Sequence, residues 1–155
     1  MSFMNTRKHS YFLSLVAIVL VCSLLMPTTA NAAVPDTAAP AASDYLVSYT
    51  TYICSIGSGA IQIWWRVTGT RHMENIGTLT IMLYESTDNS NWYWVDTFLH
   101  EDYPHMLSHD DAHYMSFVDY QGVTGRYYKA YVTIWSGGDT VGDARYMWTP
   151  VERAG

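Results

Sequence analysis

The stretch AIQIWWRVTG, residues 60–69, carries the clearest fold signal in this 155-residue chain, because apolar and polar side chains alternate along it. Successive side chains of a β-strand point to opposite faces of its sheet. The alternation therefore predicts a half-buried strand, with one face toward a core and the other toward solvent. The expected inward row is Ile61, Ile63, Trp65 and Val67, and the expected outward row is Gln62, Trp64, Arg66 and Thr68.

Similar segments, rich in Tyr, Trp, Ile, Val and Thr, lie on both sides of this stretch and are separated by clusters of Gly, Asn, Ser and Asp. β-branched and aromatic residues favour strands, whereas those clusters favour turns. Seven short strands at this spacing predict an all-β fold, an antiparallel β-sandwich, with a small barrel as the alternative. The predicted strands are 45–56, 60–69, 77–86, 91–99, 113–120, 126–135 and 143–149.

One segment resembles a motif of immunoglobulin-like sandwiches. In GRYYKAYV, Tyr128, Ala130 and Val132 share one face of the predicted strand directly after a glycine turn. This is similar to the tyrosine corner of those domains, with alanine where antibody domains place a cysteine. We therefore expect an immunoglobulin-like β-sandwich of about seven strands over residues 45–150, followed by a short tail at 151–155.

The N-terminal segment has the pattern of a signal peptide. A basic start precedes the apolar run YFLSLVAIVLVCSLLM at 11–26, and Ala30-Asn31-Ala32 supplies small residues at a cleavage site. We predict a signal peptide at 1–32, cleavage after Ala32, and secretion. The following AVPDTAAPAASD, residues 33–44, is predicted to be a flexible Ala/Pro linker.

The chain after Ala32 is acidic: six Lys and Arg face fourteen Asp and Glu, a net charge of −8. Nucleic acid and anionic membrane surfaces would repel it, so we expect neither as a partner. Cys54 is the one cysteine left after cleavage, so no disulfide can form within the secreted chain. We expect Cys54 to be buried, as free cysteines commonly are.

A series of strand-and-turn motifs runs through Ala60–Ile63, Val67–Thr70, Ile76–Tyr84, Asn89–Thr97 and Gly125–Val132. This pattern resembles small secreted proteins of Gram-positive bacteria that are grouped as a domain of unknown function. The resemblance implies secretion and a β-sandwich, with no active-site residues to transfer.

The segment HEDYPHMLSHDDAH, residues 100–113, holds four of the six histidines and is the strongest candidate for metal chemistry. His105, His109 and His113 would form one stripe on a helix and, with a carboxylate, could complete a zinc shell. Pro104 and the polar residues around it instead favour a long exposed connection between two strands. Such a loop would gain positive charge between about pH 7 and pH 5 as its histidines protonate.

No arrangement of residues indicates catalysis, so we predict no catalytic residues, no cofactor and no enzymatic activity. Ser108 precedes His109 and Asp110, but adjacency in sequence is not the geometry of a catalytic triad, and no nucleophile-elbow motif is present. Glu85, Asp88 and Asp96 could serve as paired carboxylates or calcium ligands only if the fold brought them together.

The aromatic residues give the better functional signal, because six Trp and thirteen Tyr exceed what one small core can enclose. Trp64 falls on the outward row of its strand, and Trp92 and Trp94 share a face of theirs. Exposed aromatic rings stack on sugars or anchor protein partners. We therefore predict a secreted, non-catalytic binding module for a carbohydrate or protein ligand. The alternatives are a metal-binding, possibly hydrolytic, protein that uses 100–113 and a self-associating envelope protein.

Overall fold

The computed structural model describes residues 43–155, so the predicted signal peptide and residues 33–42 of the predicted linker lie outside the described residues. The described part is all-β with antiparallel sheets, as the sequence predicted. Within residues 43–155, no helix has the length and apolar character needed to cross a membrane.

Each of the seven predicted segments forms a strand, and two further strands of two residues each were not predicted. The short strands are β5 and β9, and a single turn of 3-10 helix, η1, precedes β5. In chain order the elements are β1 (Leu46–Gly57), β2 (Ala60–Met73), β3 (Asn75–Ser86), β4 (Tyr93–Leu99), η1 (Pro104–Met106), β5 (Leu107–Ser108), β6 (Asp111–Gln121), β7 (Tyr127–Gly137), β8 (Gly142–Trp148) and β9 (Glu152–Arg153).

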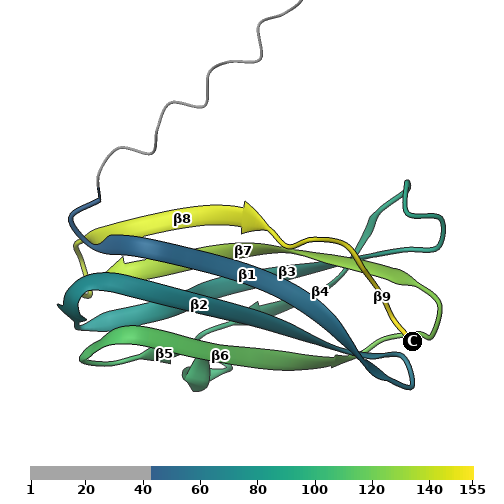
Figure 1. Cartoon of the computed structure of the whole chain (residues 1–155), viewed down its shortest axis with the longest axis horizontal. Helices are drawn as coiled ribbons and strands as arrows, with labels where there is room; N and C mark the ends of the chain where they lie inside the picture. The colour runs from purple at the N-terminus through teal and green to yellow at the C-terminus, as the bar shows by residue number, and fades with distance from the viewer. Residues whose placement is uncertain (1–42) are drawn as a thin grey trace, which may run out of the picture. The chain divides into compact units, whose positions relative to one another are not determined.

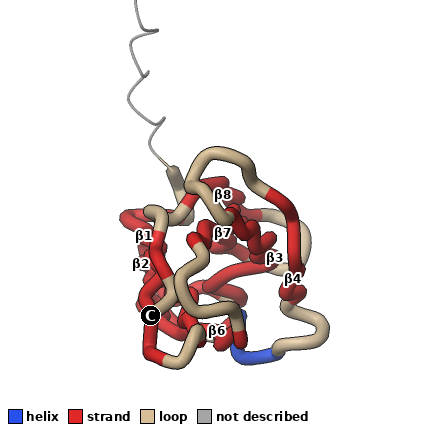
Figure 2. The backbone as a smooth tube through the Cα atoms, turned by 90° about the vertical axis from the view of Figure 1, so that its right-hand side faces the viewer, coloured by secondary structure: helices blue, strands red, loops and turns tan. Residues whose placement is uncertain are grey.

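The strands form two sheets that pack face to face (Figures 1 and 2). The first sheet has the order β1-β2-β6, and the second has the order β4-β3-β7-β8. β5 extends the second sheet beside β3, and β9 pairs with β7. Among residues 43–155, no strand ladder joins the two sheets, so the arrangement is a sandwich and not the closed barrel that was the alternative.

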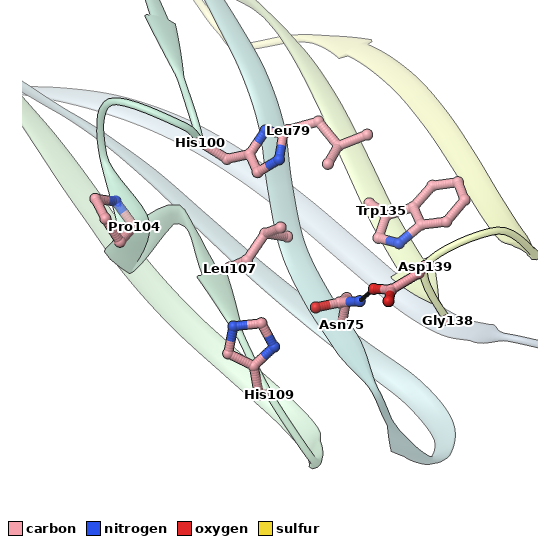
Figure 3. Close-up of a pocket in the computed structure, with 9 residues that line it drawn as sticks. All are labelled: Asn75, Leu79, His100, Pro104, Leu107, His109, Trp135, Gly138 and Asp139. Carbon is pink, nitrogen blue, oxygen red and sulfur yellow. Dashed lines mark hydrogen bonds between the residues drawn. The ribbon is translucent and has the colours of Figure 1, made fainter.

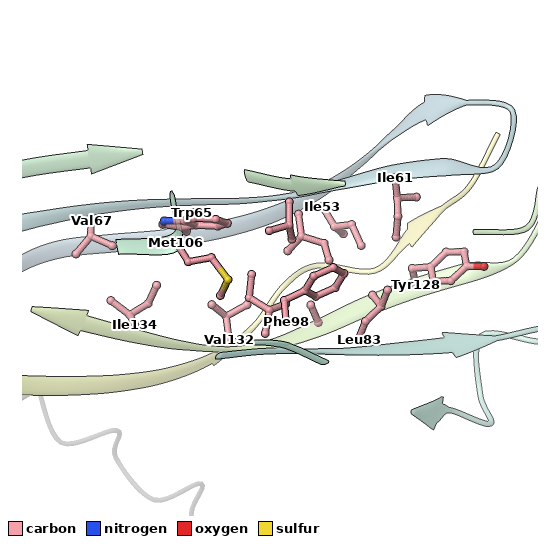
Figure 4. Close-up of a cluster of buried hydrophobic side chains, with 14 of the residues drawn as sticks. Ile53, Ile61, Trp65, Val67, Leu83, Phe98, Met106, Tyr128, Val132 and Ile134 are labelled. Carbon is pink, nitrogen blue, oxygen red and sulfur yellow. The ribbon is translucent and has the colours of Figure 1, made fainter. Parts of the chain in front are cut away.

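The core lies between the sheets and follows the alternation of β2. Its predicted inward residues have no exposed surface, and they meet a matching inward row from β3 and β7 (Figure 4). Burial of such side chains is the main favourable contribution to folding. The facing residues include Ile81, Leu83, Val132 and Ile134, which are also fully buried.

The connection between β4 and β6 differs from the predicted exposed loop, because its apolar centre belongs to the core. Met106 ends η1 with its side chain completely buried, and η1 contacts both β3 and β6. Leu107 then pairs with Gly77 of β3. Gly77 has a φ of +148°, and a Cβ there would lie 2.2 Å from the carbonyl oxygen of Met106. Histidines and carboxylates dominate residues 100–113, so the pattern of this segment did not indicate that the Met106 side chain is buried.

The last five residues also belong to the sandwich. β9 pairs with the start of β7, and Ala154 is buried. The Gly59 amide donates a hydrogen bond to the Gly155 carbonyl at 2.7 Å, which ties the end of the chain to the β1–β2 turn. The segment predicted as a tail thus covers an open side of the core beside β1 and β7.

A buried polar network fixes the start of β7. The Tyr128 hydroxyl donates to Glu85 at 2.5 Å and accepts from the Val123 amide at 2.9 Å. Arg126 pairs with the same carboxylate. Burial, and then the hydrogen bond to Glu85, raise the pKa of Tyr128 to about 12, so the neutral phenol is the form that the fold stabilises.

Met106→Ala should lower the free energy of unfolding by about 2 to 5 kcal/mol, because it empties a packed core site. Urea denaturation followed by circular dichroism measures this change. The matched control is Met115→Ala, since Met115 lies on an exposed position of β6 and its removal should change stability by less than about 0.5 kcal/mol. Equal losses in the two variants would contradict the assignment of Met106 to the core.

Tyr128→Phe should lower the free energy of unfolding by about 1.5 to 3 kcal/mol, because it removes the acceptor of the Val123 amide and one of the two partners of the partly buried Glu85 carboxylate. The pH dependence should also change. The pKa rises from 10.0 to about 12 on folding, so the contribution of Tyr128 is complete below pH 10 and is lost as pH rises toward 12. The free energy of unfolding, measured between pH 10 and pH 12, should therefore fall less steeply in Tyr128→Phe than in the control Tyr127→Phe, whose side chain faces outward.

Candidate functional site

The outer face of the second sheet carries a continuous group of aromatic side chains, here called the aromatic face. Because Tyr128, Ala130 and Val132 of β7 point inward, Lys129 and Tyr131 point outward. Register then places Trp148 of β8 beside Tyr131 and Trp94 of β4 beside Tyr84 of β3. The aromatic face comprises Tyr84, Trp92, Trp94, Lys129, Tyr131, Tyr146 and Trp148.

Direct ring contacts connect four members of this group across the strands: Tyr84, Tyr131, Tyr146 and Trp148. Trp148 lies at the centre, with its ring centroid 5.3 Å from that of Tyr84 and 4.9 Å from that of Tyr131. Tyr131 in turn stacks on Tyr146 at 6.2 Å with an angle of 11° between the rings. Contacts of this kind stabilise aromatic pairs beyond the area they bury, and they hold the rings in fixed orientations.

Lys129 links Trp92 to Trp148 at the centre of the aromatic face. Its Nζ atom lies 4.3 Å from the ring centroid of Trp92 and 4.6 Å from that of Trp148, so one ammonium contacts two indoles. Cation–π contacts of this type favour an ordered lysine. The positive charge therefore orients the two tryptophans and does not stand free in solvent.

Several rings of the aromatic face remain open to solvent despite these contacts. Tyr146 is 62% exposed, Trp94 is 60% exposed and Trp148 is 47% exposed. The Trp94 indole also donates a hydrogen bond to Thr97 Oγ1 at 3.0 Å, which fixes its ring on the edge strand β4. Large rings that are both exposed and immobilised lose little conformational entropy when a ligand binds.

The turn between β3 and β4 positions Trp92. Asp88 accepts hydrogen bonds from the Asn91 and Ser90 amides at 2.8 and 2.9 Å, and from the Asn91 side chain at 2.7 Å. The Asn91 bonds, followed by those from Ser90 and Ser86, hold the pKa of the Asp88 carboxyl well below its usual range. This carboxylate is thus occupied in ordering the turn that leads into Trp92.

The structure separates the three predicted tryptophans. Trp94 lies on β4 of the second sheet and Trp92 directly precedes that strand. Trp64 instead faces outward from the first sheet and is half-buried between two other rings. It stacks on Tyr52 with an angle of 3° between the rings and lies 4.5 Å from Phe117. Cys54, expected to be buried, is instead partly exposed on β1, in the same outward row as Tyr52.

The histidines of 100–113 also spread apart, because the segment is not the helix that would align them. His105 hydrogen-bonds the Phe117 carbonyl, His109 the Glu74 carbonyl, and His113 the Thr68 hydroxyl. In the part of the chain that the structure describes, no group of three His, Cys, Asp or Glu side chains is placed to hold a metal ion.

The other candidate polar groups have separate structural partners. Ser108 donates to the Asp111 carboxylate and not to His109, so these side chains do not form a triad. Glu85 binds Tyr128 and Arg126, Asp88 orders its turn, and Asp96 accepts from the Thr97 amide at 2.7 Å.

Sequence reasoning missed a pocket at the other end of the second sheet's outer face. The pocket has a volume of about 460 Å³ and lies between the η1–β5 segment and the β7–β8 turn (Figure 3). Alternation along 126–135 places Trp135 in the outward row and could have indicated it. Its polar side chains come from three segments that are distant in the sequence: Asn75, the pair His100 and His109, and Asp139. The lining residues are Asn75, Leu79, His100, Pro104, Leu107, His109, Trp135, Gly138 and Asp139.

Comparison with known proteins gives no family assignment. No family model and no curated protein matches the chain. A solved structure of a family 76 glycoside hydrolase from a bovine strain of Bacteroides thetaiotaomicron aligns with 72% of this chain, at a TM-score of 0.32 and 12% identity. The chain covers 20% of that protein's length, and a likeness at this level carries no argument.

Asp88→Ala should loosen the β3–β4 turn, because it removes the acceptor of four hydrogen bonds. Limited proteolysis should then cleave within residues 87–92 faster than in the parent protein. The control is Asp102→Ala, which removes an exposed carboxylate near the next turn. Since the pKa of Asp88 is lowered, the parent turn should keep its protection down to pH 4 and lose it only in stronger acid.

Proposed function

We propose that the chain is a secreted, non-catalytic binding protein, and that its aromatic face binds a carbohydrate chain. The observation that carries the proposal is the set of ordered, partly exposed rings around Trp148. Flat aromatic surfaces stack on the apolar faces of sugar rings. The hydroxyl groups of the tyrosines on this face can donate and accept hydrogen bonds with sugar hydroxyls.

Charge narrows the class of carbohydrate. Residues 33–155 carry a net charge of −8, and the lysine on the aromatic face is engaged by two indoles. An anionic polysaccharide would meet repulsion with no free cation on this face to offset it. A neutral glycan fits this surface best.

An immunoglobulin-like sandwich is the proposed scaffold. One sheet contains β1, β2 and β6, and the other contains β3, β4, β7 and β8. This division of the strands is compatible with the two sheets of such domains. The hydrogen bond from the Val123 amide to the Tyr128 hydroxyl supports a tyrosine corner. Secretion rests on the signal-peptide pattern of residues 1–32.

A protein ligand and self-association are the competing functions for the same surface. Exposed tryptophan and tyrosine side chains also anchor protein interfaces. The exposed rings lie over β4 and β8, the outer strands in the order of the second sheet, where another chain could dock. The carbohydrate proposal is preferred because the rings are spread along the sheet instead of gathered into one anchor pocket.

Binding to insoluble neutral polysaccharides tests the proposal. Purified residues 33–155 should co-sediment with at least one of cellulose, chitin, xylan or mannan, and Trp148→Ala should weaken that binding at least tenfold. Trp94→Ala should reduce it less, because Trp94 lies at one edge of the aromatic face. The matched control is Tyr52→Ala, which removes an exposed ring from the opposite sheet and should leave binding unchanged.

Circular dichroism should first show that each variant is folded. Binding that falls equally in Tyr52→Ala and Trp148→Ala would refute the assignment to the aromatic face. Concentration-dependent dimerisation that Trp148→Ala abolishes, without polysaccharide binding, would overturn the proposal in favour of self-association.

A further inference from the structure

We infer that the pocket between the η1–β5 segment and the β7–β8 turn binds the terminal unit of the glycan, so that the protein recognises chain ends. This inference rests on the proposed function in taking the ligand to be a neutral carbohydrate. The juxtaposition that carries it is one indole, one amide–carboxylate pair and two imidazoles around a single cavity.

The walls of the pocket combine an aromatic ring with an oriented pair of polar side chains. Trp135 offers a flat ring, and Asn75 Nδ2 donates a hydrogen bond to Asp139 Oδ1 at 2.8 Å. That bond orients the two side chains. Asp139 Oδ2 and the side-chain oxygen of Asn75, Oδ1, remain acceptors for sugar hydroxyls. Aromatic stacking together with a few oriented polar groups is the combination that a small hydroxylated ring requires.

The histidines add further polar groups. His109 Nδ1 is engaged by the Glu74 carbonyl, and His100 Nδ1 lies 3.1 Å from Glu101 Oε2. Each ring has a second nitrogen, Nε2, that takes part in no hydrogen bond among the described residues. Because Nδ1 of each ring faces a carbonyl or carboxylate oxygen and donates to it, Nε2 of the neutral ring can accept a hydrogen bond from a sugar hydroxyl.

Both walls of the pocket are anchored. The buried Met106 side chain and the pairing of Leu107 with Gly77 hold the η1–β5 wall against the core. On the other side, a Cβ on Gly142 would lie 2.7 Å from Trp135 Cζ2, so the glycine allows the indole to lie over β8. A preformed pocket of this kind costs little reorganisation on binding.

Charge again selects among sugars. Besides Asp139, the Glu74 carboxylate lies near the β7–β8 turn, since a Cβ on Gly138 would come within 2.8 Å of its Oε2 atom. Glu101 lies beside His100. These three carboxylates disfavour uronic acids and sulfated or phosphorylated sugars.

The pocket and the aromatic face belong to one surface. Lys129, Tyr131, Thr133 and Trp135 form a single outward row of β7, and Tyr146 lies beside Thr133. Trp135 lies six residue steps along the strand from Lys129, a distance of about 20 Å at the usual rise per residue. This length accommodates several linked sugars, with the end unit in the pocket and the next units over Tyr146 and Trp148.

Calorimetric titration with a size series tests the inference. The probes are glucose, mannose, xylose and N-acetylglucosamine, their β-linked oligomers of increasing length, and glucuronic acid as the charged comparison. At least one neutral monosaccharide should bind, and Trp135→Ala and Asp139→Ala should each weaken it at least tenfold. Trp148→Ala should leave monosaccharide binding unchanged but abolish the gain in affinity with chain length. Glucuronic acid should bind at least tenfold more weakly than the neutral sugar.

The outcomes separate this inference from the proposed function. Oligosaccharide binding that depends on Trp148 but is unchanged in Trp135→Ala and Asp139→Ala would refute the pocket and leave the aromatic face in place. Monosaccharide binding that Trp135→Ala abolishes, without binding to any longer glycan, would keep the pocket as a sugar site but refute the proposed function and, with it, the recognition of chain ends. If Trp135→Ala does not fold, Asp139→Ala decides, because Asp139 is exposed in the turn.

Discussion

Burial of the inward row of β2 against β3 and β7 is the interaction on which the rest of the structure depends. Ile61, Ile63, Trp65 and Val67 lose all contact with solvent there, and the opposing sheet supplies an equally apolar layer. A slip of one residue in register would exchange this row for Gln62, Trp64, Arg66 and Thr68. The free energy of core burial therefore fixes the register of the first sheet, and with it the identity of every outward side chain.

The same constraint creates the aromatic face. Once Tyr128, Ala130 and Val132 of β7 are committed to the core, Lys129 and Tyr131 must face outward, and strand pairing brings Trp148 and Tyr84 beside them. The rings then pack on one another and on the lysine, which keeps them ordered without burying them completely. The surface that we propose to bind a ligand is thus a direct consequence of core packing on the opposite side of the same sheet.

Short elements close the sides of the sandwich and shape the pocket. η1 and β5 insert Met106 between the sheets, and β9 covers the side near β1 and β7. The η1–β5 segment thus has a buried side that contributes to stability and a solvent side that forms one wall of the pocket. Because His109 directly follows β5, its position depends on the packing of Met106 in the same short segment.

The sequence by itself determined the all-β class, the approximate bounds of the seven long strands and the inward and outward rows of β2, because these follow from local alternation and turn chemistry. It also predicted that Trp92 and Trp94 share one face of their strand. It could not show that Trp64 lies on the other sheet, that Met106 is a core residue, or that His105, His109 and His113 diverge. Those facts depend on which strands pair. Only the tertiary structure brought Trp148 to Tyr84 and joined Asn75 to Asp139, since contacts between residues 64 apart in the chain arise from sheet topology and not from local pattern.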